Sequence, residues 1–135
     1  MGRILALDYG FKRTGIAVTD EMQIIASGLA TVPTKDLMPY LEKYFKAANV
    51  ELVLVGEPKQ MDNTASQSEG VILEFLVKFG EKFPQMEVKR VDERFTSKMA
   101  VRTMIDSGLG KKKRQDKALL DEISATIILQ TYLYK

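Results

Sequence analysis

The chain has 135 residues, a length typical of one domain with a single hydrophobic core. We expect one domain spanning residues 1–135. The sequence contains neither cysteine nor histidine, which excludes disulfides, thiolate zinc sites, cysteine nucleophiles and histidine-based triads. Any hydrolytic chemistry must therefore use carboxylates, a lysine or a bound metal ion that prefers oxygen ligands, such as Mg²⁺.

The net charge of +2 is unevenly distributed along the chain. Ten Lys or Arg and four Asp or Glu lie between Val88 and Lys117, whereas the remainder has ten against fourteen. A basic third predicts a polyanionic partner such as nucleic acid, and a solvated lysine-rich loop is the plainer alternative. No apolar run approaches the roughly 20 residues of a membrane span, and the run at 4–7 is too short for a signal peptide. We therefore expect a cytoplasmic protein without a membrane partner.

The first half of the chain predicts three strands followed by a helix and a fourth strand. Strands are expected at 4–7, 16–19 and 24–32, with Gly28 as a candidate bulge. The two connections are short, so the strands should form an antiparallel meander. Helical spacing follows at 37–48, where Thr34 or Asp36 could cap the first turn. The continuous apolar run at 52–55 indicates a strand covered on both faces.

The second half alternates helices with one more strand. Overlapping capping boxes at 64–69 open a helix, a strand is expected at 86–91, and helices are expected at 97–106 and 117–134. The helix that opens at 64–69 should bury five apolar side chains, Val71, Ile72, Phe75, Leu76 and Phe79. The sequence thus predicts an α/β fold with a mixed five-stranded sheet, in which an antiparallel three-strand meander precedes two parallel strands and helices cover both faces.

Acidic residues follow the predicted strands. Asp8 ends the first strand, Glu57 the fourth, and Asp92 and Glu93 the fifth. In open α/β sheets the site lies at the carboxyl ends of the parallel strands, so these acids should converge if strands one and four pair. The plainer alternatives are a turn-capping role for Asp8 and an acidic lead-in to the next helix for Asp92 and Glu93.

The last helix carries a further acid, Asp121. We predict a buried stripe on this helix made of Leu120, Ile123, Ile127 and Thr131, with Ser124 and Ile128 beside it. Asp121 lies at the border of the stripe, and the small residues Ser124 and Ala125 should let the helix approach the sheet closely. An exposed acid in the first helical turn is the alternative.

Three converging carboxylates alone would repel an anionic phosphodiester, but one or two bound Mg²⁺ ions, ~3.5–4 Å apart when paired, would make the site positive. Basic residues could then hold the flanking phosphates: Lys12, Arg13, Lys59, Arg94, Lys111, Lys112, Lys113 and Arg114. Aromatic candidates for base stacking are few, namely Tyr9 and Phe11, so sequence-specific readout is not expected.

Four ordered motifs resemble the YqgF family, also called RuvX. They are Leu-Asp-Tyr-Gly at 7–10 with Thr-Gly-Ile-Ala-Val at 14–18, Val-Gly-Glu-Pro at 55–58 with Met-Asp-Asn-Thr at 61–64, Asp-Glu-Arg-Phe-Thr-Ser at 92–97, and Asp-Glu-Ile-Ser-Ala-Thr-Ile-Ile-Leu at 121–129. The resemblance implies a ribonuclease-H-like three-layer fold. It also implies that Asp8, Glu93 and Asp121 are the catalytic acids and metal ligands, with Asp92 as the neighbour most easily confused with Glu93.

Two positions depart from the family pattern. Asn63 stands where the family usually has glycine, and Asn also tolerates a left-handed turn. Glu122 stands where the family usually has a small residue, and its helical phase predicts a side chain directed to solvent.

The resemblance implies a hydrolase, a nuclease that uses Mg²⁺ or Mn²⁺ to process the 5′ end of precursor 16S rRNA in ribosome biogenesis. Its expected partner is structured RNA, in the form of precursor rRNA or a pre-ribosomal particle. The first alternative is a Holliday-junction resolvase acting on branched DNA, which requires a stable two-fold dimer; we expect a monomer or a weak dimer. The second is a non-enzymatic RNA- or ribosome-associated factor whose acids are structural, for which Asp8→Asn would leave cellular function intact.

Overall fold

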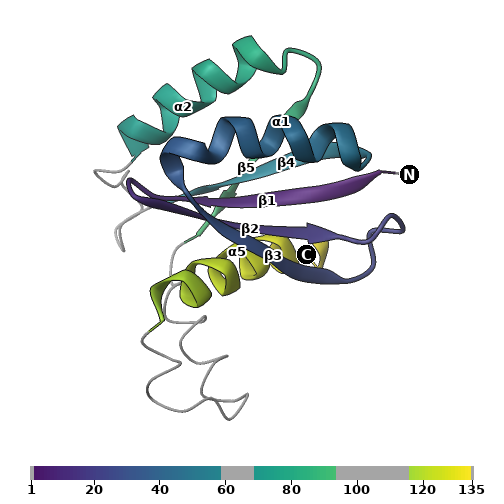
Figure 1. The fold of residues 1–135 in the computed structure, drawn as a ribbon. Helices are drawn as coiled ribbons and strands as arrows, with labels where there is room; N and C mark the ends of the chain where they lie inside the picture. Colours follow the sequence, from purple (N-terminus) through teal and green to yellow (C-terminus); the bar gives the residue numbers. More distant parts are fainter. Residues whose placement is uncertain (1, 59–68, 94–115, 135) are drawn as a thin grey trace.

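The computed structural model describes residues 2–58, 69–93 and 116–134 (Figure 1). Its elements in chain order are β1 (Arg3–Tyr9), β2 (Arg13–Thr19), β3 (Ala26–Pro33), the 3₁₀ turn η1 (Thr34–Asp36), α1 (Leu37–Ala47), β4 (Val50–Glu57), α2 (Glu69–Lys82), β5 (Glu87–Asp92) and α5 (Lys117–Leu133). The predicted helix at 97–106 and most of the capping boxes at 64–69 lie outside these ranges. No helix within the ranges is both long and apolar enough to cross a membrane.

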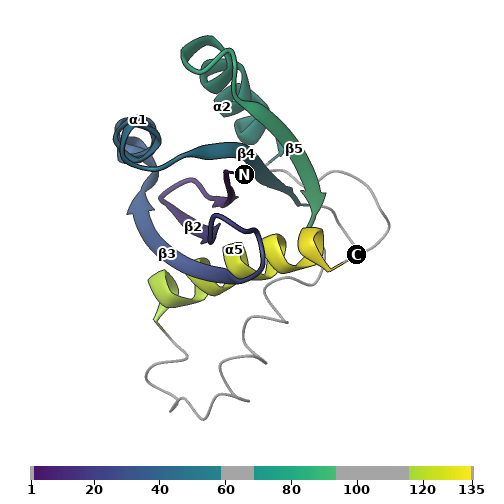
Figure 2. The same cartoon turned by 90° about the vertical axis from the view of Figure 1, so that its right-hand side faces the viewer.

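The five strands form one mixed sheet in the order β3-β2-β1-β4-β5. Strand β2 is antiparallel to both β1 and β3, whereas β4 is parallel to both β1 and β5. Helices α1 and α2 cover one face and α5 covers the other (Figures 1 and 2). The predicted fold, including the pairing of the first and fourth strands, is confirmed.

Strand β3 contains the bulge that was predicted at Gly28. Ile16 of β2 pairs with Ala30, but the next residue, Ala17, pairs with Gly28. One residue of β3 is therefore left without a partner in the register, which is the definition of a bulge.

The alternation of side chains along β1 decides where its carboxylate goes. Leu5 and Leu7 belong to the core beneath α1 and α2, and Ile4 and Ala6 belong to the core beneath α5. Because side chains of a strand alternate between faces, Asp8 lies on the face covered by α5. Both faces of β1 are buried, which explains its continuous apolar sequence.

Of the two predicted caps of α1, Asp36 occupies the N-cap position but its side chain makes no capping hydrogen bond, and Thr34 lies at the start of the 3₁₀ turn that precedes the helix. The Thr34 hydroxyl instead donates to the Gly10 carbonyl at 2.6 Å and lies 2.9 Å from the Thr14 hydroxyl. Thr34 therefore braces the turn between β1 and β2.

The third strand begins two residues later than predicted. The Asp20 carboxylate accepts the backbone N–H groups of Ile24 and Ile25, each at 2.8 Å, and holds both residues in the loop before β3. These hydrogen bonds replace the ladder bonds that a longer strand would make. Both side chains are exposed, at 59% and 62%.

Helix α5 faces the sheet with part of the predicted stripe, since Ile127, Ser124 and Ile128 are buried as predicted. Its N-cap is Asp116, whose carboxylate accepts the N–H groups of Ala118 and Leu119. The buried residues are Ser124, Ala125, Ile127, Ile128 and Leu129, whereas Leu120 and Ile123 are half-buried and Thr131 is exposed. The small residues fix the contact with the sheet, so the helix is rotated toward Ala125 and the prediction for Thr131 is wrong.

Strand β2 and α5 come into close backbone contact at Gly15. A Cβ atom built at Gly15 would overlap the backbone carbonyl of Asp121. Gly15 therefore allows the first turns of α5 to lie directly on β2. The close approach predicted from Ser124 and Ala125 is confirmed, with the contact extending to the backbone of Asp121.

We expect Gly15→Ala to lower the free energy of unfolding by about 1–3 kcal/mol, because over-packing at a backbone contact forces the helix away from the strand. Gly80→Ala is the matched control. Gly80 lies in α2 with open space where its Cβ would be, so alanine there should stabilise the protein by about 0.5–1 kcal/mol. Urea denaturation measures both effects, and equal stability of Gly15→Ala and the wild type would contradict the close contact.

Candidate active site

Two acids from different strands meet across the end of β4. Glu93 follows β5, and its backbone N–H donates to the Glu57 carbonyl at 3.2 Å, which extends the ladder by one residue. Its carboxylate lies over Gly56, where a Cβ atom would come within 2.7 Å of it. The side chains of Glu93 and Asp8 are hydrogen-bonded to each other. The missing side chain at Gly56 provides the space for this contact.

The environment of this pair favours protonation. Burial raises the pKa of Asp8 to about 6, against the lowering effect of its hydrogen bond with Glu93, and the charge of Asp121 raises it further. Burial raises the pKa of Glu93 to about 9, and the adjacent Asp8 is the next cause. A hydrogen bond between two carboxyl groups needs a proton on one of them. The pair therefore holds a proton where it could hold a cation.

Asp121 lies on α5 next to this pair and is bound to an arginine. Arg13 Nε, at the start of β2, donates to Asp121 Oδ2 at 2.8 Å. The Asp121 side chain is 23% exposed, so the alternative of a freely exposed acid in the first helical turn is wrong. Its charge reaches Asp8, whose pKa it raises. Asp121 therefore belongs to the same electrostatic environment as Asp8.

The oxygen atoms of these acids are suitable ligands for Mg²⁺ or Mn²⁺. Asp8 and Glu93 are hydrogen-bonded to each other, and a divalent cation could take the place of the proton that this pair favours. Within ranges 2–58, 69–93 and 116–134, no three acidic side chains are gathered around one point, because Asp121 is turned to Arg13. The structure thus brings two of the three predicted acids together and places the third beside them.

Arg90 is a neighbour of the site that was not predicted. Its guanidinium binds both carboxylate oxygens of Glu69, at 2.7 and 3.2 Å, and donates to the carbonyls of Gly56 and Val55 at 3.0 and 3.2 Å. Its charge lowers the pKa of Glu93, against the larger effects of burial and Asp8. Arg90 therefore fastens the start of α2 to the ends of β4 and β5. The only signal in the sequence was a charged residue in a strand next to the buried Val91.

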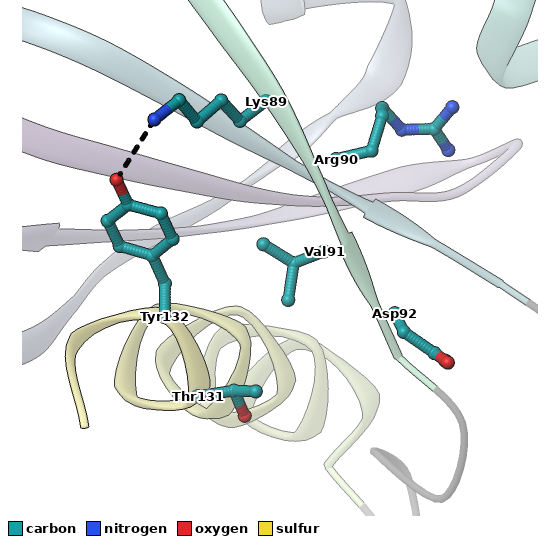
Figure 3. Close-up of a pocket in the computed structure, with 6 residues that line it drawn as sticks. All are labelled: Lys89, Arg90, Val91, Asp92, Thr131 and Tyr132. Carbon is teal, nitrogen blue, oxygen red and sulfur yellow. Dashed lines mark hydrogen bonds between the residues drawn. The ribbon is translucent and has the colours of Figure 1, made fainter. Parts of the chain in front are cut away.

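Asp92 and Glu93 point into different environments. Asp92 lines a cavity of about 540 Å³ between β5 and the last turns of α5, and Figure 3 shows it at the end of β5. The cavity is lined by Lys89, Arg90, Val91, Asp92, Thr131 and Tyr132. Within it, Lys89 Nζ donates to the Tyr132 hydroxyl at 3.4 Å. Glu93, and not its neighbour, contacts Asp8.

The predicted basic residues are only partly described. Lys12 and Arg13 lie at the turn between β1 and β2, at the same end of the sheet as Asp8. The others, Lys59, Arg94, Lys111, Lys112, Lys113 and Arg114, lie outside the described residues, as does Asn63.

The predicted direction of Glu122 is wrong. Its side chain packs against β3, where a Cβ atom at Gly28 would overlap it. The rotation of α5 that buries Ala125 also turns Glu122 toward this edge of the sheet.

A mixed five-stranded sheet of this order, covered by helices on both faces, has the architecture of the ribonuclease-H-like class of folds. Among solved structures, RuvC of T. thermophilus, determined in complex with a Holliday junction substrate, matches with a TM-score of 0.59. The match covers 98% of this chain and 94% of that chain at 18% identity. This likeness confirms the predicted fold.

The sequence comparisons identify the family within this class. The RuvX family, described as "Holliday junction resolvase", matches residues 2–135. A protein of Christiangramia forsetii named "Putative pre-16S rRNA nuclease" is 70% identical over 135 residues and covers 100% of both chains. A protein of the same name from Flavobacterium johnsoniae is 65% identical over 133 residues, 98% of this chain and 96% of its own. The chain belongs to the RuvX family, and its predicted class, a nuclease acting on phosphodiester bonds, is confirmed.

Proposed function

We propose that the chain is a metal-dependent nuclease that processes the 5′ end of precursor 16S rRNA in the cytoplasm. The hydrogen-bonded pair of Asp8 and Glu93 at the carboxyl ends of β1 and β5 is the observation that carries this proposal. Burial raises the pKa of both acids, so they favour a shared proton whose place a cation could take, and Asp121 lies beside them. The names of the relatives support precursor rRNA as the substrate.

In this proposal Asp8, Glu93 and Asp121 are the catalytic acids and would hold Mg²⁺ or Mn²⁺. The bound ion would supply Lewis acidity and neutralise developing charge on the phosphate. Asp8 and Glu93 would have to give up their shared proton to solvent before they could hold the cation. Gly56 leaves the space in which Glu93 can reach Asp8. Arg90 donates to the Gly56 carbonyl and so holds the end of β4, across which the two acids meet.

Arg13 and Lys12 would bind the substrate at the same end of the sheet. Arg13 is half-exposed and sits against Asp121, so its guanidinium could bind a phosphate once Asp121 turns to a cation. Lys12 is exposed in the adjacent turn. Lys59, Arg94 and the run from Lys111 to Arg114 remain the further predicted phosphate contacts. Contacts of this kind position a backbone without reading its sequence.

A second candidate is resolution of branched DNA, which the description of the family favours. Two symmetric cuts in a junction require a two-fold dimer. We propose a monomer or a weak dimer, which fits cleavage of one RNA strand better. Sedimentation of the purified protein at increasing concentration, with and without a four-way junction, separates these possibilities.

The direct test is cleavage of two substrates by the purified protein with Mn²⁺: a precursor 16S rRNA 5′ leader joined to its mature sequence, and a four-way DNA junction. We expect cleavage of the leader by the wild type, none by Asp121→Asn, and little cleavage of the junction. Preferential cleavage of the junction by a stable dimer would favour the resolvase. Failure to cut either substrate, or equal cutting by Asp121→Asn, would contradict a nuclease with these acids.

A further inference from the structure

Phe11 is the most exposed of the large hydrophobic side chains that the structure describes. It is 71% exposed and lies in the turn between β1 and β2. Figure 1 shows this turn at the same end of the sheet as the start of α5, where Asp121 lies. An isolated exposed apolar residue needs no explanation by itself, so the meaning of Phe11 depends on how it is held and on what surrounds it.

Hydrogen bonds hold the turn that carries Phe11, both at the residue before it and at the residue after it. Thr34 donates its hydroxyl to the Gly10 carbonyl at 2.6 Å, and its backbone N–H donates to the Lys12 carbonyl at 2.9 Å. The Thr34 hydroxyl is also 2.9 Å from that of Thr14, which is fully buried. The residues before and after Phe11 are therefore both tied to η1. Phe11 is presented to solvent by a fixed backbone.

The other aromatic candidate for base stacking, Tyr9, already packs against a ring of the protein. The rings of Tyr9 and Phe75 are 4.7 Å apart between centroids, so Tyr9 packs onto α2. Of the two aromatic residues that the sequence offered for base stacking, only Phe11 has a free ring. The exposed Lys12 and the half-exposed Arg13 follow it directly, and both can bind phosphate.

We propose that Phe11 stacks on an unpaired base of the nucleic acid strand held at the acids, which makes single-stranded nucleic acid the substrate form at this end of the site. The proposal rests on the proposed nuclease function. Asp8 is three residues before Phe11, in the last part of β1, and three residues of chain span at most roughly 10 Å, so the Phe11 backbone lies within about that distance of the Asp8 backbone. A base close to the cut position could reach the ring. A base inside a duplex could not, because both of its faces are covered by neighbouring base pairs.

The first test compares binding of a single-stranded RNA oligonucleotide with binding of the same oligonucleotide carrying abasic positions, in Ca²⁺ so that cleavage is suppressed. Loss of a base–aromatic stack typically weakens binding by roughly 5- to 100-fold. We expect this loss for Phe11→Ala with the complete strand, and unchanged binding of the abasic strand and of a duplex. Phe11→Leu should behave like Phe11→Ala, because leucine is apolar but has no ring.

Two controls separate stacking from charge and from general apolar contact. Lys12→Gln should weaken binding of the complete and abasic strands alike and reduce the dependence of affinity on salt. Ile25→Ala removes a side chain that is 62% exposed, in the loop at the opposite end of β2, and should change neither affinity.

The second test uses Phe11→Trp, which introduces a single tryptophan into a chain that has none. We expect this variant to bind like the wild type and its fluorescence to be quenched by the complete strand but not by the abasic strand. Unquenched fluorescence at saturation, or equal losses of affinity for both strands in Phe11→Ala, would overturn the stacking site. If the wild type and Phe11→Ala also cut the rRNA leader equally, the nuclease function would stand without the stacking site. If the wild type binds no nucleic acid, both proposals fail.

Discussion

Asp8→Asn is expected to lower the rate of Mn²⁺-dependent cleavage by about 10³-fold or more. Metal-ion catalysis contributes several kcal/mol to stabilising the transition state, and each 1.36 kcal/mol corresponds to a factor of ten in rate. Asparagine keeps the size of the side chain and can still hydrogen-bond to Glu93, so the fold should be preserved. Single-turnover cleavage of the rRNA leader measures the effect.

Binding should separate from cleavage in the same variant. We expect Asp8→Asn to bind the leader within a few-fold of the wild type, because the basic residues supply most of the affinity. Asp92→Asn is the matched control, since Asp92 is one residue from Glu93 but lines the cavity between β5 and α5. It should cut at nearly the wild-type rate. An Asp8→Asn enzyme within tenfold of the wild type would show that the carboxylate is structural.

The second large effect is a loss of stability of the metal-free protein as the pH rises. The pKa values of Asp8 and Glu93 are raised in the folded state, to about 6 and about 9. Between about pH 4 and pH 9 the folded chain therefore binds protons that the unfolded chain has released, so the free energy of unfolding decreases with pH. This contribution is complete below pH 4 and is lost as the pH passes the two raised values.

The double variant Asp8→Asn/Glu93→Gln should lack this dependence. At pH 9 in EDTA we expect it to be more stable than the wild type by several kcal/mol, because each pKa unit corresponds to about 1.4 kcal/mol and both pKa values are raised. At pH 5 the difference should be small. Urea denaturation at both pH values measures it, and parallel pH curves for the two proteins would contradict the raised pKa values.

Mg²⁺ provides the complementary measurement. A ligand that binds only the folded state raises the free energy of unfolding. The gain grows with the logarithm of the ratio of the ligand concentration to the dissociation constant. At pH 8 the wild type should therefore gain stability with added Mg²⁺ and the double variant should not. A gain of the same size in both proteins would place the ion elsewhere.

The sheet and the Asp8–Glu93 pair could be predicted because each depends on local pattern and a general rule. Apolar runs identified the strands, short connections identified the meander, and the rule for the carboxyl ends of parallel strands brought Asp8 and the neighbours Asp92 and Glu93 to one edge. The family resemblance then singled out Glu93. What could not be predicted was decided by contacts between distant segments. The Arg13–Asp121 ion pair joins residues 108 positions apart, and no local pattern in the sequence encodes it.

The errors on α5 and η1 have the same cause. Periodicity placed Thr131 in the buried stripe, but contact at Gly15 and Ala125 rotates the helix away from it. The same rotation carries Glu122 toward β3. Thr34 had the residue type and position of a helix cap, but the turn between β1 and β2 uses its hydroxyl instead. In each case tertiary contact overrode a correct reading of local preference.

The most direct measurement is anomalous X-ray diffraction from crystals of the wild type grown with Mn²⁺. A peak should lie between the carboxylates of Asp8 and Glu93, with their mutual hydrogen bond broken and Asp121 turned from Arg13 toward the ion. Crystals at saturating Mn²⁺ in which Asp8 and Glu93 remain bonded to each other, with no anomalous density near them, would contradict a shared metal site.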